Sequence, residues 1–174
     1  MNRAVFLDRD GVINRAIVKD GLPNPPSDVS ELVIPDDVPE ALTRLRESGF
    51  RLVVVSNQPD VARGMQSEGS VIAMNAILKD LLAIDEFRVC FHDDGDDCDC
   101  RKPLPGMLLE AAAGAHIDLA ASFMVGDRWR DIEAGKRAGC RTIFVDHGYD
   151  EQLQSEPDEI VKTLSEAAEW ILSH

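Results

Sequence analysis

Short, almost entirely apolar runs alternate along this chain with segments of helical periodicity. Apolar runs of this kind are typical of strands that are buried on both faces of a parallel sheet. They occur at residues 4–7, 52–55, 87–91, 123–125 and 142–145. Apolar residues spaced three or four positions apart, as on one face of a helix, occur at residues 38–45, 71–82, 105–112, 132–138 and 160–171. This alternation predicts an α/β fold in which a doubly wound parallel sheet carries helices on both faces, with residues 142–145 as its last strand.

The segments between these runs carry further local information. Ser70 is expected to cap the helix at residues 71–82, because a serine hydroxyl can accept a hydrogen bond from a free amide of the first turn. Residues 17–39 hold five of the nine prolines, and we expect them to form a long structured loop of a type that is often functional. No internal repeat or break in composition divides the 174 residues. We therefore predict a single domain over residues 1–174.

The chain is strongly acidic, with 18 Lys and Arg residues, 32 Asp and Glu residues and a formal net charge of −14. This charge repels phosphate backbones and anionic lipids, so neither nucleic acid nor a membrane is expected as a partner. Only four apolar residues directly precede Asp8, and a signal peptide requires a longer apolar core. We expect a cytoplasmic monomer whose partner is a small phosphorylated molecule, held by local cations and a metal.

Polar side chains follow the apolar runs where strands are expected to end. Asp8 and Asp10 follow the first run, Ser56 and Asn57 follow the second, and Asp127 follows the fourth. Ligands of open parallel sheets bind outside the carboxyl ends of the strands, so these side chains are expected to form one site. Asp, Ser and Asn are also common in turns for local structural reasons, but turn chemistry alone explains their coincidence at several strand ends poorly.

Carboxylates gathered at one edge of a sheet require a cation to offset their repulsion. Hard oxygen ligands of this kind suit Mg²⁺, which binds through one or two carboxylates together with phosphate. Lys102 can neutralise phosphate oxygens, and the Ser56 hydroxyl can donate a hydrogen bond to one of them. A free carboxylate such as Asp8 can attack phosphorus to form an acyl phosphate. Asp10, two residues later, can protonate the leaving oxygen and then activate water.

A cysteine- and histidine-rich loop follows the third apolar run. Cys90 and His92 form one closely spaced pair, and Cys98 and Cys100 form a second. Residues two apart on an extended chain point the same way, so each pair can present two ligands to one side. Three thiolates and one imidazole suit a structural Zn²⁺, although a polar loop with incidental cysteines is the alternative. We hypothesise that zinc fixes the turn that directs Lys102 towards phosphate.

Four motifs, in order along nearly the whole chain, resemble those of the haloacid dehalogenase (HAD) superfamily of phosphatases. They are Phe6-Leu-Asp8-Arg-Asp10-Gly-Val, Ser56-Asn57-Gln58, Cys-Arg-Lys102-Pro and Val-Gly-Asp127-Arg-Trp-Arg-Asp131. The resemblance implies Asp8 as the nucleophile and Asp10 as the general acid and base. It further implies Mg²⁺ binding by Asp8, the Asp10 main-chain carbonyl and Asp127, phosphoryl binding by Ser56 and Lys102, and a supporting role for Asp131. Phosphate-transferring ATPases of the superfamily have Thr at the Asp10 position, so Asp10 favours hydrolysis.

The Cys/His loop and the Cys-Arg-Lys-Pro sequence after it look like those of the D-glycero-D-manno-heptose 1,7-bisphosphate phosphatases and the related histidinol-phosphate phosphatases. The resemblance to the heptose group implies that Arg101 and Arg128 contact the substrate, with Asn57 and Gln58 beside them. Removal of the C7 phosphate from a heptose bisphosphate is therefore the expected reaction. Histidinol phosphate and a broad range of sugar phosphates are the alternatives. The intervals between the motifs leave no room for a cap domain, so we expect an open site.

Two functions from other classes share some of these features. A phosphoacceptor signalling module also has an acidic pocket at the strand ends and binds Mg²⁺, but Asp10 and the Cys/His loop argue against it. A nucleic-acid end phosphatase is a second alternative, because relatives without a cap can act on polymers. The net charge of −14 and the lack of a basic stripe argue against that function.

Overall fold

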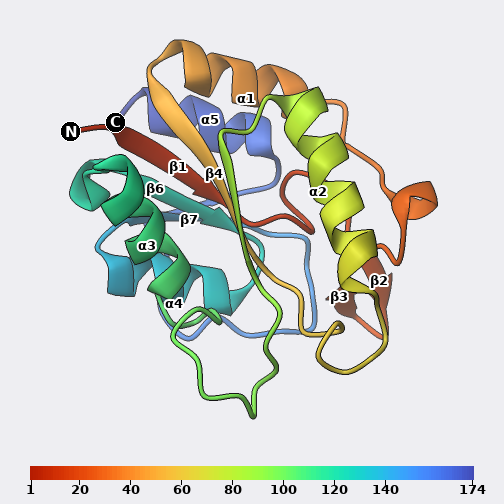
Figure 1. The fold of residues 1–174 in the computed structure, drawn as a ribbon. Coiled ribbons are helices and arrows are strands. Elements are labelled where there is room, and N and C mark those ends of the chain that lie inside the picture. Colours follow the sequence, from red (N-terminus) through yellow and green to blue (C-terminus); the bar gives the residue numbers. More distant parts are fainter.

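A six-stranded parallel sheet forms the centre of the computed structural model, which describes residues 1–174 (Figure 1). The strands lie in the order β5-β4-β1-β6-β7-β8, and every neighbouring pair is parallel. Their bounds are β1 Arg3–Leu7, β4 Phe50–Asn57, β5 Glu86–Cys90, β6 Phe123–Gly126, β7 Arg141–Val145 and β8 Glu159–Val161.

Five α-helices cover the two faces of this sheet. Their bounds are α1 Val38–Glu47, α2 Glu68–Leu82, α3 Gly106–Ala115, α4 Trp129–Ala138 and α5 Leu164–Leu172. Helices α1 and α5 lie side by side on one face, and α3 and α4 lie on the other (Figure 1). The predicted doubly wound fold with helices on both faces is confirmed.

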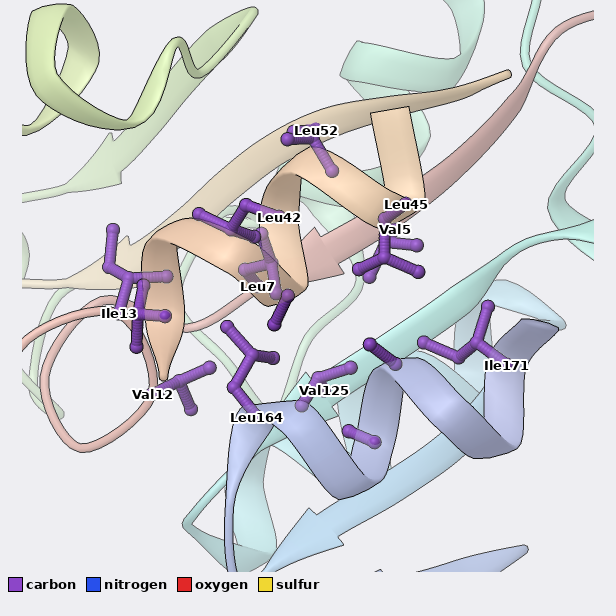
Figure 2. Close-up of a cluster of buried hydrophobic side chains, with 14 of the residues drawn as sticks. Val5, Leu7, Val12, Ile13, Leu42, Leu45, Leu52, Val125, Leu164 and Ile171 are labelled. Carbon is purple, nitrogen blue, oxygen red and sulfur yellow. The ribbon is translucent and has the colours of Figure 1, made fainter. Parts of the chain in front are cut away.

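The side chains of β1 explain why its sequence is continuously apolar. Val5 and Leu7 belong to the hydrophobic cluster between the sheet, α1 and α5, which Figure 2 shows in close-up. Ala4 and Phe6 point to the opposite face and pack in the cluster beneath α3 and α4. Successive side chains of a strand point to opposite faces, and both faces are covered here. All four residues are fully buried as a result.

The strand order brings the polar strand ends together. From β1 the chain adds β4 and β5 on one side, then crosses to add β6, β7 and β8 on the other. Leu7 pairs with Val54 of β4 and with Val125 of β6. The residues that follow these three positions therefore reach the same edge of the sheet. This is the switch point at which open α/β sheets bind ligands.

Two details of the sequence-based assignment are wrong. Ile160 lies in β8, which pairs with β7, so residues 142–145 are not the last strand and the final helix begins at Leu164. Ser67 rather than Ser70 caps α2, because the Ser67 hydroxyl accepts a hydrogen bond from the Ser70 amide. The apolar spacing of α2 starts only at Val71, but the helix itself begins three residues earlier, at Glu68. The N-cap therefore lies at Ser67, nearer the N-terminus than the apolar pattern predicts.

The long segment after β1 contains more regular structure than the predicted loop. It holds an antiparallel hairpin of β2 Ile17–Lys19 and β3 Leu22–Asn24 and a short 3₁₀ helix, η1 Val29–Glu31. A second 3₁₀ helix, η2 Leu119–Ala121, precedes β6. The hairpin is the only sheet outside the central one, so the predicted absence of a cap domain is confirmed. None of the helices has the length and apolar character needed to cross a bilayer.

Candidate active site

Three buried carboxylates meet at the carboxyl ends of β1 and β6. Asp8 directly follows β1, Asp127 directly follows β6, and Asp131 lies in the first turn of α4. One oxygen atom of each lies within 4.8 Å of an oxygen of the others. A Cβ atom at Gly126 would collide with the Asp131 side chain, so glycine permits this close approach. The carboxylate cluster of Asp8, Asp127 and Asp131 requires compensating positive charge.

Lys102 supplies part of that charge from a buried position. Its Nζ donates hydrogen bonds to Asp8 Oδ1 at 2.8 Å and to the Val55 carbonyl at 2.7 Å. The same atom forms an ion pair with Asp131 Oδ1 at 2.6 Å. Burial lowers the pKa of Lys102, but the Asp131 and Asp8 carboxylates raise it more, so the pKa lies above its ordinary value. Lys102 therefore stays protonated beside the carboxylates.

The remaining electrostatics of the cluster fit a divalent cation. Burial, followed by the Asp131 charge, raises the pKa of Asp8 to about 6. Burial and the Asp8 charge also raise the pKa of Asp127 well above its ordinary value. Both Asp127 oxygens are buried, and the Tyr149 hydroxyl is the one donor close to them, an arrangement that is costly unless a cation is bound. The hard oxygen donors of Asp8 and Asp127 suit Mg²⁺.

The carboxylate cluster differs in one respect from the predicted set of magnesium ligands. The structure brings Asp8 and Asp127 together as predicted, and it adds Asp131, for which the resemblance implied only a supporting role. The Asp131 oxygens are engaged by Lys102 Nζ and by the Arg128 amide, which donates to Oδ2 at 3.0 Å. Asp131 therefore orients Lys102 and the start of α4. The Asp10 carboxylate lies outside the cluster, as expected if only its main-chain carbonyl is a ligand.

Three side chains hold the Asp10 carboxylate in one orientation. Asn14 Nδ2 donates to Asp10 Oδ1 at 2.9 Å, and Gln58 Nε2 donates to Oδ2 at 2.8 Å. The Arg9 guanidinium donates to both oxygens at 3.2 Å. Gln58 Nε2 also donates to Ser56 Oγ at 2.9 Å. One buried amide therefore positions both the predicted general acid and the predicted phosphoryl-binding hydroxyl.

The predicted zinc ligands also come together, at the last residue of β5 and on the loop that follows it. The ligand atoms of Cys90, His92, Cys98 and Cys100 all lie within 4.8 Å of one another, and all four cysteines of the chain are free thiols. Cys90 Sγ lies 3.4 Å from His92 Nδ1 and 3.9 Å from Cys98 Sγ. Tetrahedral zinc sites, with bonds of about 2.0–2.3 Å, place their ligand atoms at similar separations, whereas Cys90 Sγ and Cys100 Sγ lie closer together, at 2.8 Å. The donor set of this Cys/His cluster therefore fits structural Zn²⁺.

Short contacts link the Cys/His cluster to Lys102. The Asn57 side chain donates to the Lys102 carbonyl and accepts from the Lys102 amide, both at 3.0 Å. The Gln58 main-chain N–H donates to the Cys90 carbonyl at 2.8 Å, and Arg101 Nη1 donates to the His92 carbonyl at 3.2 Å. Asn57, at the end of β4, therefore holds the Lys102 backbone directly, and the bonds of Gln58 and Arg101 tie the adjoining residues to the Cys/His loop.

The carboxylate cluster lines a cavity of about 270 Å³ that has no hydrophobic lining residue. Of the predicted substrate contacts, Asn57, Arg101 and Arg128 line this cavity, whereas Gln58 is fully buried beside Asp10 and Ser56. Two further arginines, Arg63 and Arg130, also line the cavity, together with Asp60, Asp94 and residues of the β2–β3 hairpin segment, Pro23, Asn24 and Pro25. A cavity lined by charged and polar groups suits an anionic, hydroxyl-rich ligand.

Several supporting residues were missed by the sequence reasoning. Arg9, which lies between the two motif aspartates, is fully buried, and its Nη1 donates to Asn75 Oδ1 at 3.0 Å. Glu151 holds Arg128 by two hydrogen bonds at 2.8 and 2.5 Å. Asn75 interrupts the apolar face of α2, and a polar residue at a core position is a usable indication of a buried partner. No comparable pattern identifies Glu151.

The fold and the site together define a class of protein. A doubly wound parallel sheet, a carboxylate cluster at its switch point and a buried lysine from a neighbouring loop make up the arrangement expected of a HAD-type hydrolase. The comparisons with known proteins agree, because a family model described as HAD-hydrolase-like matches residues 99–167.

Relatives over nearly the full length define the family more closely. The chain is 36% identical to a D-glycero-beta-D-manno-heptose-1,7-bisphosphate 7-phosphatase of Yersinia pestis, over 98% of this chain and 89% of the relative. It is also 36% identical to the D-glycero-D-manno-heptose-1,7-bisphosphate 7-phosphatase of Chlorobaculum tepidum, over 95% and 92% of the two chains. The crystal structure of a D,D-heptose 1,7-bisphosphate phosphatase from B. bronchiseptica, complexed with magnesium and phosphate, matches with a TM-score of 0.85 and 30% identity, over 98% of both chains. The chain belongs to the heptose 1,7-bisphosphate phosphatase family of HAD-like hydrolases.

Proposed function

We propose that this protein is a Mg²⁺-dependent phosphatase that removes the C7 phosphate of D-glycero-D-manno-heptose 1,7-bisphosphate through an aspartyl phosphate. The observation that carries the proposal is the buried carboxylate cluster, in which Lys102 donates a hydrogen bond to Asp8. The neighbouring Asp10 lies outside this cluster and is held by its own hydrogen bond from Gln58. The names of the relatives and the magnesium and phosphate in the B. bronchiseptica enzyme support it.

In the first half-reaction, a carboxylate oxygen of Asp8 attacks the phosphorus of the C7 phosphate. The bond between phosphorus and the sugar oxygen breaks, and Asp10 donates its proton to that oxygen. Lys102 holds Asp8 Oδ1 in place at 2.8 Å, and Ser56 Oγ donates a hydrogen bond to a phosphoryl oxygen. Positioning of this kind contributes much of the catalysis in phosphoryl transfer.

In the second half-reaction, the Asp10 carboxylate removes a proton from water while the water oxygen attacks the phosphorus of the aspartyl phosphate. The bond to Asp8 breaks, inorganic phosphate leaves, and both aspartates return to their starting states. Gln58, Asn14 and Arg9 keep the Asp10 carboxylate in the same orientation for both steps. General acid and base catalysis by one positioned group requires this constancy.

Asp8, Asp127 and the Asp10 main-chain carbonyl hold the magnesium ion in this proposal. When bound, Mg²⁺ neutralises the carboxylates and draws negative charge from the phosphoryl oxygens. The Cys/His cluster holds structural Zn²⁺ and takes no part in the chemistry. Its contribution is to fix the loop from which Lys102 and Arg101 reach the cavity.

The experiment that tests this function is the measurement of kcat/KM for phosphate release with Mg²⁺. The substrates are both anomers of the heptose bisphosphate, hexose bisphosphates and histidinol phosphate, with Asp8→Asn as the blank. We expect one heptose bisphosphate anomer to lead the other sugar phosphates by about 100-fold. A lead by histidinol phosphate would assign the histidinol-phosphate phosphatase reaction instead. Equal low values for all substrates would leave the phosphatase chemistry standing but show that the preferred substrate is not among those tested.

A further inference from the structure

We propose that Arg130 determines specificity by binding, together with Arg101, the phosphate that the enzyme does not cleave. This inference rests on the proposed function and deepens it, because it assigns the position of the second phosphate of a bisphosphate substrate. Neither the motifs nor the resemblance assigns a role to Arg130, which lies in the first turn of α4. The geometry of the four arginines around the cavity supports the assignment.

Arg101 and Arg130 are brought together by a single carboxylate, Asp94. Asp94 Oδ1 accepts a hydrogen bond from Arg101 Nε at 2.9 Å, and the same atom lies 3.2 Å from Arg130 Nη1. Both guanidinium groups line the cavity that contains the carboxylate cluster. Two residues that lie far apart in the sequence, one after the Cys/His loop and one on α4, thus form an arginine pair.

Arg130 is ordered by a second contact besides Asp94. Its guanidinium carbon lies 4.8 Å from the centre of the Trp129 ring, a cation–π distance. The Arg130 side chain is 28% exposed, whereas the Asp94 side chain is 57% exposed. The contacts with Trp129 and Asp94 restrict this long side chain, so much of its ordering cost is met before a ligand arrives.

Charge balance distinguishes this pair from the other two arginines of the cavity. Arg128 has its own carboxylate, Glu151, which engages it at two atoms. Arg63 is bonded at two atoms by Asp93 and also contacts Asp60. Arg101 and Arg130 share only Asp94, so two positive charges face one negative charge. Surplus positive charge beside the cavity therefore lies at the arginine pair.

The free donors of the pair match the needs of a phosphate group. A guanidinium group has five N–H donors in a planar fork, and the two groups use only a few of them on Asp94 and the His92 carbonyl. A phosphate offers several acceptor oxygens and favours such forks. With Lys102 and Ser56 at the phosphoryl group that is transferred, the arginine pair provides a separate anion position in the same cavity.

The test compares Arg130→Ala with the unmodified protein on two substrates of one sugar. One carries both phosphates, and the other carries only the phosphate that is cleaved. We expect the KM for the bisphosphate to rise about tenfold or more, as for the loss of a charge-assisted hydrogen bond, with kcat within about twofold. The KM for the monophosphate should change by less than about twofold. Arg130→Lys, which keeps the charge, should recover part of the bisphosphate preference.

Arg44→Ala is the matched control, because Arg44 pairs with Glu169 on the outer surface of α1 and α5. It should leave both KM values unchanged. Equal effects of Arg130→Ala on the two substrates, or no effect on either, would overturn the inference. If the unmodified protein hydrolyses no heptose bisphosphate, the proposed substrate fails, and fructose 1,6-bisphosphate and fructose 6-phosphate then provide the comparison. If the protein shows no preference for any sugar bisphosphate over the corresponding monophosphate, the proposed role of the arginine pair in phosphate binding is refuted. The proposed phosphatase chemistry would remain intact.

Discussion

The two candidate metal centres of this protein are assembled in opposite ways. The carboxylate cluster takes its members from the ends of two strands and the first turn of a helix, at Asp8, Asp127 and Asp131. All three are buried. The Cys/His cluster takes its members from one short stretch of chain, the last residue of β5 at Cys90 and the loop up to Cys100, and its members range from buried to exposed.

This difference indicates what each centre depends on. The carboxylate cluster exists because the sheet is formed, and its geometry follows from the register of β1 with β6. The Cys/His cluster is local, and the adjoining loop has little hydrophobic packing of its own. We therefore expect loss of the first centre to stop the chemistry in a folded protein, and loss of the second to release the loop and weaken the chemistry indirectly.

Asp8→Asn should give the largest effect on activity. An amide is not a nucleophile towards phosphorus, so kcat should fall by about 10⁴-fold or more. The sheet should remain intact, because the asparagine side chain has nearly the same shape. Phosphate release and circular dichroism measure the two properties. Turnover by the variant at even a few per cent of the original rate would contradict a covalent role for Asp8.

Removal of zinc should give the next largest effect. Cys98→Ser, or treatment with a chelator followed by excess Mg²⁺, should lower kcat/KM by about 10- to 100-fold, as for loss of a group that positions catalytic residues. Cys140→Ser is the control, since Cys140 lies outside the Cys/His cluster. Metal content and phosphate release should be measured on the same samples. Full activity in a verified zinc-free protein would refute the link between the loop and Lys102.

Asn57→Ala tests the contact that joins the two centres. Loss of both hydrogen bonds to the Lys102 backbone should lower kcat about tenfold while KM changes little. Asn2→Ala is a matched control, because the Asn2 amide also bonds a backbone carbonyl, at Ala115, but lies outside the cavity. A rise in KM with unchanged kcat would instead indicate that Asn57 contacts the substrate, as the resemblance implied.

The smallest effect should be on thermal stability. Saturation with Mg²⁺ at about 100 times its Kd stabilises a folded protein by about 2.7 kcal/mol, which corresponds to a rise in Tm of about 5–10 °C for a chain of this size. Asp127→Asn should abolish this rise, because the substitution removes the negative charge and one of the two oxygen atoms that would bind the cation. Asp97→Asn, on the exposed part of the Cys/His loop, should retain it. An equal rise in both variants would place the cation elsewhere.

The sequence predicts two members of the carboxylate cluster well because they directly follow buried apolar strands, whereas Asp131 lies in the first turn of α4. Asp8 and Asp127 are placed by strand ends that are visible as apolar runs. The four candidate zinc ligands are equally visible, since all of them lie between Cys90 and Cys100. Both predictions depend only on local spacing and on one general property of parallel sheets.

Other features depend on contacts that leave no periodic pattern. Strand β8 has only three residues, and Ile160 there matches helical spacing with the following residues by coincidence. The contact between Arg130 and Asp94 joins a helix to a loop through two charged side chains that are individually ordinary. Glu151 reaches Arg128 from an acidic connector that resembles a solvated surface. Contacts of this kind arise only when the folded chain brings distant segments together.

The central claim is that the carboxylate cluster performs covalent catalysis with Asp8 as the nucleophile. The most direct test is rapid acid quenching during turnover of the preferred sugar phosphate, followed by mass spectrometry of the peptide that contains Asp8. We expect a covalently bound phosphoryl group on that peptide, and none in the Asp8→Asn variant. Phosphate release without any phosphorylated Asp8, together with turnover by Asp8→Asn, would contradict the account.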